Sequence, residues 1–385
     1  MITIDFTSLS ALATGVCGVF FLIQLFYILG IYSRLHRHFS RKPYTEPADL
    51  PPISVIIVTK DSGEILNENL PAILEQDYPL FEVIVINDKS AGEDGVILKR
   101  LSDRYSNLYH TFIPETARYV SRKKLGVAMG IRASRYEWIV VTSPFGRPVS
   151  PNWLRSLARE MTPDTDIVLG YSNYFPKKGF FARRVIVSSF FRSLRYLCMA
   201  LAGHPYMGIG YNLAYRKSVY QAHKGFSDHL QLLRGEDDLL VNAVAKRSNT
   251  RVARGAESIV RLPVPAFKRV WKEEKLSAMV TGYYYRGIAP WLNSIETWTC
   301  GLFYVSWGIA LCISILAHEW IWTGIVGLFG LVRFLSIMHF LYHSAWDLQE
   351  KFGCFLPFFD LFRPVGSLMR YVQYLFCKKE DFMRR

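Results

Sequence analysis

Residues 51–90 read PPISVIIVTKDSGEILNENLPAILEQDYPLFEVIVINDKS. Two runs in this stretch, ISVIIVT (53–59) and FEVIVIND (81–88), are rich in β-branched residues, and between them leucines and isoleucines recur at helical spacing over 64–75. A continuous β-branched run is typical of a strand that is buried on both faces, as in a parallel sheet. The stretch therefore predicts a strand–helix–strand unit, which is the building block of α/β folds.

The same alternation continues along the chain. Residues 91–105 and 122–134 are helical by pattern, and LYHTFI (108–113) and EWIVVTS (137–143) are predicted strands. We therefore expect an α/β domain over residues 51–265, with a mainly parallel sheet flanked by helices. Ligands of such sheets bind beyond the carboxyl ends of the strands. Neither GxGxxG nor GxxxxGK[ST] follows a strand here, so a Rossmann dinucleotide site or a P-loop is unsupported.

The chain before this domain contains a run without charged residues, from Phe6 to Ser33. About 20 apolar residues are enough to cross a bilayer, so we predict a transmembrane helix over 9–32, after a short N-terminal end (1–8). A signal peptide is a poor alternative, because no basic residue precedes the run and the run is too long. A basic linker (33–50) follows, with Arg34, Arg37, Arg41 and Lys42, and by the positive-inside rule it is cytoplasmic.

Two more apolar runs follow the domain, at 297–317 and 320–346. They predict a transmembrane hairpin that turns at His318–Glu319, and Arg333 inside the second run should face a neighbouring helix or water. Residues 266–296 are expected to form an amphipathic, interfacial segment. The tail, 347–385, is expected to be cytoplasmic and to include an interfacial helix; its basic residues are Lys378, Lys379, Arg384 and Arg385. Two buried core helices are the alternative for the hairpin.

Composition by itself leaves two classes of protein open. The 385 residues are 50% hydrophobic and carry a net charge of +14, which suits a nucleic-acid binder or a membrane protein with basic cytoplasmic flanks. The apolar runs favour an inner-membrane protein, and no nucleic-acid-binding motif is present. The stretch from Ile167 to Ser227 has no acidic residue and mixes arginines with large apolar side chains. It predicts a helix lying on anionic lipid, or alternatively a core helix with exposed arginines.

Several motifs occur in a characteristic order: PPISVIIVTKDSGEIL, LPAILEQDYPLFEVIVINDKS, SRKKLGVAMGIRASRYEWIVVTS, RPVSPNWL, GIGYNLAYRKSVY and GEDDLLV. In this order they resemble the inverting GT-A glycosyltransferases of family 2. The layout is similar to a membrane-anchored bacterial branch with one N-terminal and two C-terminal transmembrane helices. The resemblance implies hexosyl transfer from a nucleotide-sugar donor to a hydroxyl of a polysaccharide or lipid-linked acceptor, with inversion.

The resemblance also implies the site residues. Asp88 would hold the nucleobase, with Thr59 and Asp61 beside the base and ribose; a plain turn aspartate is the alternative for Asp88. Lys123, Lys124 and Arg147 would neutralise phosphate. In GEDDLLV, Asp237 would be the general base, with Asp238 as the second candidate and Glu236 as an orienting residue. The alternative for these acids is helix N-terminal charge.

Two departures from the family pattern affect the mechanism. The family's Asp-x-Asp, which holds Mg²⁺ or Mn²⁺, is replaced by Ser143-Pro144-Phe145, and after Trp271 the expected Gln-Lys-x-Arg-His element is missing. Hard cations need oxygen ligands such as carboxylates. Three outcomes are open: a metal-independent transferase, a metal held by other groups, or a catalytically silent protein that binds a nucleotide sugar or another glycosyltransferase. Cysteines offer no metal site, because Cys17, Cys300 and Cys312 lie in apolar runs and no pair has CxxC spacing.

Overall fold

The structure is a computed structural model, and it describes residues 8–41, 49–88, 93–114, 116, 121–353 and 356–376. The chain divides into two compact units. Among the described residues, the first unit combines residues 8–40 with residues 288–376, and the second lies within residues 41–287. The predicted tail residues Lys378, Lys379, Arg384 and Arg385, and Lys42 in the linker, lie outside the described residues.

The second unit is an α/β domain built on a seven-stranded sheet with the order β3-β2-β1-β4-β8-β6-β9. Strands β3, β2, β1 and β4 are parallel to one another, β8 runs antiparallel to both of its neighbours, and β6 and β9 are parallel. The strands are β1 (Ile53–Thr59), β2 (Phe81–Asn87), β3 (Leu108–Phe112), β4 (Trp138–Thr142), β6 (Ile167–Leu169), β8 (Leu213–Arg216) and β9 (Thr250–Val252). This confirms the α/β class with a mainly parallel sheet.

Helices cover both faces of this sheet. Successive side chains of a strand point to opposite faces, so Ile53, Val55 and Ile57 share one face of β1. They belong to one core cluster with residues of α3 (Gly63–Leu74), α4 (Asp94–Arg104) and α6 (Trp153–Ala158). On the other face, α5 (Arg122–Ala133) packs on β1 and β2. Burial on both faces explains why these strands have no polar alternation.

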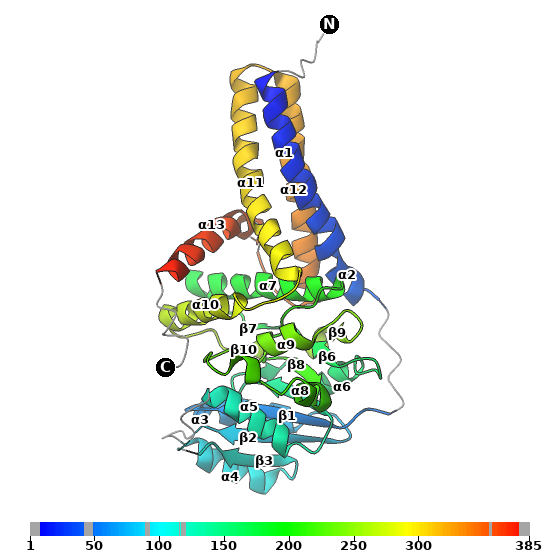
Figure 1. Ribbon diagram of the computed structural model, residues 1–385, viewed down its shortest axis with the longest axis vertical. Coiled ribbons are helices and arrows are strands. Elements are labelled where there is room, and N and C mark those ends of the chain that lie inside the picture. Colours follow the sequence, from blue (N-terminus) through cyan, green and yellow to red (C-terminus); the bar gives the residue numbers. More distant parts are fainter. Residues whose placement is uncertain are drawn as a thin grey trace. The chain divides into compact units, whose positions relative to one another are not determined.

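The remaining elements of the domain lie around the far half of the sheet. A second sheet has the order β5-β10-β7, in which β10 is antiparallel to β5 and parallel to β7. The long helix α7 contacts β7 and β9 (Figure 1). The bounds are β5 (Arg147–Pro148), β7 (Ser172–Tyr174), α7 (Phe180–Leu201), α8 (Lys217–Ala222), α9 (Asp238–Val244), β10 (Val260–Leu262) and α10 (Lys268–Gly282).

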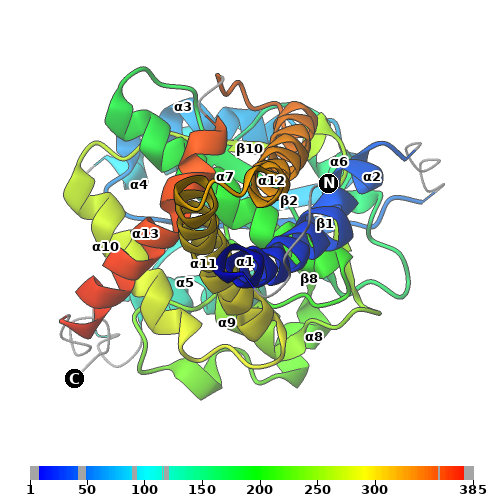
Figure 2. The same ribbon diagram turned by 90° about the horizontal axis from the view of Figure 1, so that it is seen from above.

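The first unit contains three helices that are long and apolar enough to cross a membrane: Leu9–Phe39, Ala289–Leu316 and Trp320–Asp347. The first consists of α1 (Leu9–Phe26), a π-helical turn (Tyr27–Tyr32) and α2 (Ser33–Phe39), and the others are α11 and α12. Figures 1 and 2 show α1, α11 and α12 side by side, and each pair is in contact. A fourth helix, α13 (Leu356–Leu375), packs on α11 and α12.

The structure changes some predicted boundaries. The first long helix runs on to Phe39, and α11 begins at Ala289 rather than at 297. The segment predicted as one interfacial piece, 266–296, is divided between α10 and the first two turns of α11. The compact domain accordingly extends to Gly287 rather than to residue 265. Helix α7 is buried along much of its length and only part of its basic residues are exposed, which fits the core-helix alternative for the acid-free stretch.

Candidate active site

The first turn of α5, together with the residue before it, holds a distant loop in place. The Ser121 hydroxyl donates to the carbonyl of Leu233 (2.8 Å), and the Lys124 ammonium donates to the carbonyls of His229 (2.5 Å) and Leu232 (2.8 Å). Lys124 is fully buried. Its charge is therefore used to fix the segment that leads into GEDDLLV, and it does not face an open site in this structure.

Arg122 and Lys123, which lie between Ser121 and Lys124 in the sequence, contact the predicted donor and catalytic residues. The Arg122 guanidinium forms an ion pair with Asp88, and the Lys123 ammonium forms one with Glu236 and lies 3.9 Å from Asp237. Arg122 and Lys123 are consecutive residues, so Asp88 and the acidic segment are both held by the first turn of α5. Asp88 and the acidic triplet, 148 or more residues apart in the sequence, are thus linked through two adjacent residues of α5.

The three consecutive acids have different surroundings. Glu236 is 4% exposed and pairs with Lys123. Asp238, the first residue of α9, accepts hydrogen bonds from the Thr281 hydroxyl (2.6 Å) and the Tyr285 hydroxyl (2.7 Å), so its carboxylate holds the end of α10 and the residues after it. Only Asp237, whose side chain is 16% exposed, keeps a carboxylate that is not committed to a tight ion pair or to hydroxyl donors in these contacts.

Gly210 allows the approach of Asp237. The Gly210 backbone N–H donates a hydrogen bond to the Asp237 carboxylate. A Cβ atom at position 210 would lie only 2.1 Å from Asp237 Oδ2, well inside van der Waals contact. A residue without a side chain is therefore required here, because the carboxylate meets the backbone directly.

The environment separates the acidities of the neighbouring carboxyls. Burial raises the pKa of Asp237, the Lys123 ammonium lowers it, and the negative charges of Glu236 and Asp238 raise it, so that it reaches about 7. Burial would also raise the pKa of Glu236, but the ion pair with Lys123 outweighs it and the pKa is lowered. Glu236 is thus held as a carboxylate while Asp237 exchanges its proton near neutral pH, as a general base should.

The other predicted donor residues lie near the ends of β1 and β2. The Asp88 backbone N–H donates to the carbonyl of Thr59 (2.8 Å), which places Asp88 next to the end of β1. The Thr59 hydroxyl donates to Asp94 (2.8 Å) and is fully buried, so it contributes to the site through its backbone. Asp61 is exposed, with a left-handed φ of 47°, which aspartate tolerates better than most residues. Asp94 was not predicted from the sequence.

Arg147 lies on the short strand β5, directly after the loop that follows β4. Its guanidinium is 47% exposed and lies 3.5 Å from Glu68 on α3. A charge exposed to this extent is screened by water and contributes little to stability, so the side chain is available to a ligand at small cost.

The loop at the Asp-x-Asp position does not offer metal ligands. The Ser143 hydroxyl accepts a hydrogen bond from the Phe145 backbone N–H (3.3 Å), the Pro144 carbonyl accepts one from Asn69 (3.2 Å), and Phe145 is 37% exposed. Mg²⁺ and Mn²⁺ need several carboxylate or other oxygen ligands, and this loop supplies no carboxylate. Among the residues that the structure describes, no three His, Cys, Asp or Glu side chains form a cluster able to hold a metal ion. The family's metal therefore does not fit here.

Tyr211 and Arg234 are further residues that sequence reasoning missed. The Tyr211 carbonyl accepts from the Thr142 hydroxyl (2.9 Å), which places Tyr211 at the end of β4, beside Ser143. Burial raises the pKa of Tyr211, as does Glu274, and the positive charges of Lys123, Arg192 and Arg234 oppose this, so those cations lie around it. The signal for Arg234 was its position next to GEDDLLV, where a lone basic residue precedes three acids.

Trp271 has a packing role in α10. Its ring meets Phe181 edge to face at 6.0 Å, and the Arg184 guanidinium lies 5.6 Å above it. One turn further on, Glu274 accepts a hydrogen bond from the Tyr174 hydroxyl (3.4 Å) and lies 3.6 Å from Arg192. These contacts fix α10 against α7.

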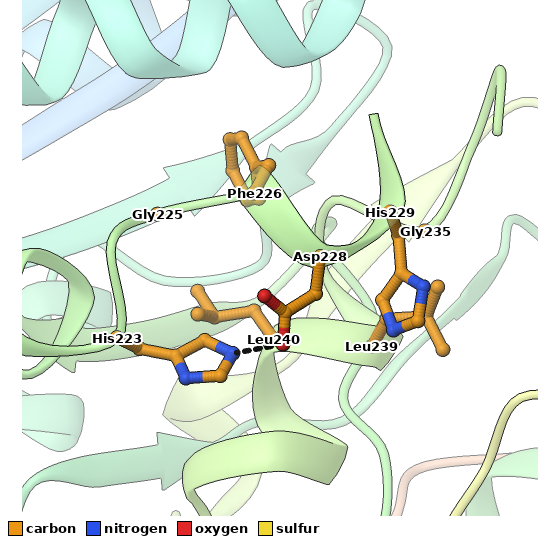
Figure 3. Close-up of a pocket in the computed structure, with 8 residues that line it drawn as sticks. All are labelled: His223, Gly225, Phe226, Asp228, His229, Gly235, Leu239 and Leu240. Atoms are coloured by element: carbon orange, nitrogen blue, oxygen red, sulfur yellow. Dashed lines mark ion pairs between the residues drawn. The ribbon is translucent and has the colours of Figure 1, made fainter. Parts of the chain in front are cut away.

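A small pocket lies next to the acidic segment (Figure 3). Gly235 and Leu239, on either side of the three acids, contribute to its wall, and His223 faces Asp228 across it at 3.9 Å. Because Lys124 binds the carbonyl of His229, which also lines this pocket, the pocket and the start of α5 are parts of one assembly.

Comparison with known proteins bears on the family and the fold of this domain. Residues 54–223 match the model of glycosyl transferase family 2. The mannosyltransferase PcManGT from Pyrobaculum calidifontis, solved with GDP-Man and Mn²⁺, is 18% identical, and the match covers 89% of this chain and 99% of that one with a TM-score of 0.56. Residues 1–349 of S. aureus TarS, solved in complex with UDP-GlcNAc, match over 84% of this chain and 90% of that one, at 13% identity and a TM-score of 0.41.

At identities this low, a solved structure is evidence for the fold alone. PcManGT, with a TM-score of 0.56, supports the GT-A fold of this chain. The family match spans β1 to α8. It therefore includes Asp88, which directly follows β2, and Lys123 in the first turn of α5. Residues 54–223 form a family 2 glycosyltransferase domain of the GT-A fold, and the chain is a glycosyltransferase with three helices suited to crossing a membrane.

Proposed function

We propose that this glycosyltransferase moves a sugar from a nucleotide-diphosphate donor to a hydroxyl of a polysaccharide or lipid-linked acceptor and inverts the anomeric carbon. The observation that supports the proposal is that two adjacent residues of α5 contact the predicted donor and catalytic residues, Arg122 at Asp88 and Lys123 at Asp237. A donor bound by its nucleobase at Asp88 would extend along the start of α5 towards the acidic segment.

Asp237 is the general base in this proposal. As the acceptor oxygen forms its bond to the anomeric carbon, its proton passes to the Asp237 carboxylate, and the bond between that carbon and the diphosphate oxygen breaks with its electron pair on the diphosphate. A single displacement of this kind inverts the configuration. Glu236 keeps Lys123 beside Asp237, and Asp238 fixes the start of α9.

The donor side uses charge-assisted hydrogen bonds. The Asp88 carboxylate accepts from a nucleobase N–H, and Asp61 lies near the ribose. Lys123, Arg147 and Arg234 are the cations that we assign to the diphosphate, because each is exposed, whereas Lys124 is fully buried.

The first experiment is a screen of nucleotide sugars followed by a transfer assay with the purified full-length protein. The Asp237→Asn variant should bind the same donor with similar affinity but turn it over about 10²- to 10⁴-fold more slowly, because only the proton acceptor is lost. NMR of the product would report the anomeric configuration. Equal turnover by wild type and variant, or retention of configuration, would remove this proposal.

We further propose that transfer proceeds without a divalent metal at the Ser143–Phe145 loop. PcManGT was solved with Mn²⁺, so the chelation experiment is decisive. EDTA should leave the transfer rate of this protein unchanged, and added Mg²⁺ or Mn²⁺ should not raise it, since the loop provides no carboxylate. Loss of activity in EDTA with recovery on adding Mn²⁺ would show that other groups hold a metal.

A further inference from the structure

Helix α13 has two unlike faces. One carries Asp360 and Arg363, and Asp360 is fully buried. The opposite face is apolar, and its residues recur at helical spacing while each remains more than 40% exposed: Phe358, Phe362, Val365, Met369 and Val372. An exposed stripe of this size and regularity is typical of a surface that has a partner.

The charged face is fixed to the helical unit. Asp360 accepts from Arg333 of α12 (2.9 Å) and from the Tyr304 hydroxyl of α11 (3.1 Å), and Arg363 lies 3.2 Å from Asp360. Arg363 also forms an ion pair with Glu296 of α11. Two cations and two anions balance, so no net charge is buried, and the apolar stripe of α13 must point away from α11 and α12.

The same network includes α1. Arg333 donates to the Gln24 side-chain oxygen (3.1 Å), and the Gln24 amide donates to the Glu296 carbonyl (3.1 Å). Of the two predicted surroundings of Arg333, a neighbouring helix or water, the structure shows the first. Helices α1, α11, α12 and α13 all contribute to one polar cluster, which fixes the position of α13 along the bundle.

That position can be placed relative to the bilayer. With 1.5 Å per residue, Glu296 lies about 30 Å from the hairpin end of α11, and Arg333 lies about 20 Å from the start of α12. A hydrocarbon layer is about 30 Å thick. If the hairpin marks one edge, α13 meets the bundle within about 10 Å of the other edge, the depth at which amphipathic helices lie in membranes.

We propose that α13 is an interfacial helix whose apolar stripe, Phe358 to Val372, is buried among lipid acyl chains, while the Arg333–Asp360–Arg363–Glu296 cluster fixes it to the spanning helices. The partner is the lipid bilayer itself. The five residues of the stripe include no charge, and the polar cluster fixes the helix near the expected edge of the hydrocarbon layer. This inference is independent of the donor, the acceptor and the reaction.

Depth-dependent fluorescence quenching tests the proposal with the full-length protein in nanodiscs. In a background in which Cys312, Cys354 and Cys377 are serine, single cysteines at Met369 and at Ser367 are labelled with bimane. Met369 lies on the stripe and Ser367 on the opposite face of the same helix. Brominated phospholipids should cause a loss of fluorescence at position 369 and little or none at position 367.

Equal quenching at the two positions would overturn the proposal, and so would disulfide-linked dimers through position 369, which would identify a second copy of the chain as the partner. Asp360→Asn should weaken the contrast between the two labels, because it removes the carboxylate that holds Arg333, whereas Asp360→Glu should preserve more of it. The comparison of positions 369 and 367 stands even if Asp360→Asn does not fold.

Discussion

At the scale of single residues, the site depends on opposite influences on one carboxyl. Burial raises the pKa of Asp237, the Lys123 ammonium lowers it, and the Glu236 carboxylate raises it. The balance leaves the pKa of Asp237 near 7, so catalysis through this base should increase as pH rises through neutrality, where Asp237 loses its proton.

Substitutions of Lys123 and Glu236 should shift the midpoint of the pH–rate profile in opposite directions. In Lys123→Gln the midpoint of the pH–rate profile should move to higher pH, because the cation that stabilises the Asp237 carboxylate is gone. In Glu236→Gln it should move to lower pH, because a repelling anion is gone and Lys123 is left with Asp237 alone.

The measurement is kcat/KM against pH for each variant, with Lys99→Gln on the exposed face of α4 as the control. The control should keep the wild-type midpoint. A shift in the same direction for both variants would contradict the assignment of Asp237 as the titrating group, because a group elsewhere would not distinguish the two charges.

At the scale of elements, the acidic segment is held by helices that lie far away in the sequence. The start of α5 holds residues 229–237, and the end of α10 holds Asp238 through Thr281 and Tyr285. Asp237 therefore lies between two residues that are fixed by these contacts, Glu236 and Asp238.

Loss of the hydrogen bond between Tyr285 and Asp238 should lower the stability of the protein by a measurable amount. Tyr285→Phe removes a hydroxyl donor from a largely desolvated carboxylate and should cost about 1.5–3 kcal/mol of stability, the usual range for a hydrogen bond to a charged group. Tyr283→Phe is the matched control, since Tyr283 is 73% exposed and only two residues away.

Thermal unfolding of the two variants in detergent provides the readout. Tyr285→Phe should unfold at a clearly lower temperature than wild type, and Tyr283→Phe within about a degree or two of it. If both variants behave alike, the Asp238 contact does not hold the end of α10.

At the scale of the whole molecule, basic and apolar residues occur together because the chain combines a glycosyltransferase domain with three helices suited to a membrane. The arginines that follow the first long helix, Arg34, Arg37 and Arg41, predict that the domain faces the cytoplasm.

Protease accessibility tests this orientation. In intact spheroplasts the domain, residues 41–287, should be protected from added protease, and in inverted membrane vesicles it should be cleaved. Alkaline carbonate should not release the protein, because its attachment is through hydrocarbon rather than through charge. Cleavage in spheroplasts would place the domain on the other side.

Much of the architecture was predictable because it is encoded locally. The four strands of the parallel half, the helices between them and the three long apolar helices follow from residue types that recur at fixed spacing. Boundaries were less accurate at α11, where Glu296 made the helix look shorter. In the structure, Glu296 is buried in an ion pair with Arg363, 67 residues further on. Its charge is therefore neutralised, and the helix can include it.

The sequence by itself determined the α/β order, the apolar helices and the presence of three adjacent acids, because each is a pattern within a short window. Only the tertiary structure decided that Asp238 binds two hydroxyls while Asp237 does not, that Lys124 binds backbone carbonyls while Lys123 pairs with Glu236, and that Arg333 pairs with Asp360. These outcomes depend on burial and on charges brought together from distant segments, and a pKa or an ion pair follows from distances in space rather than from spacing along the chain.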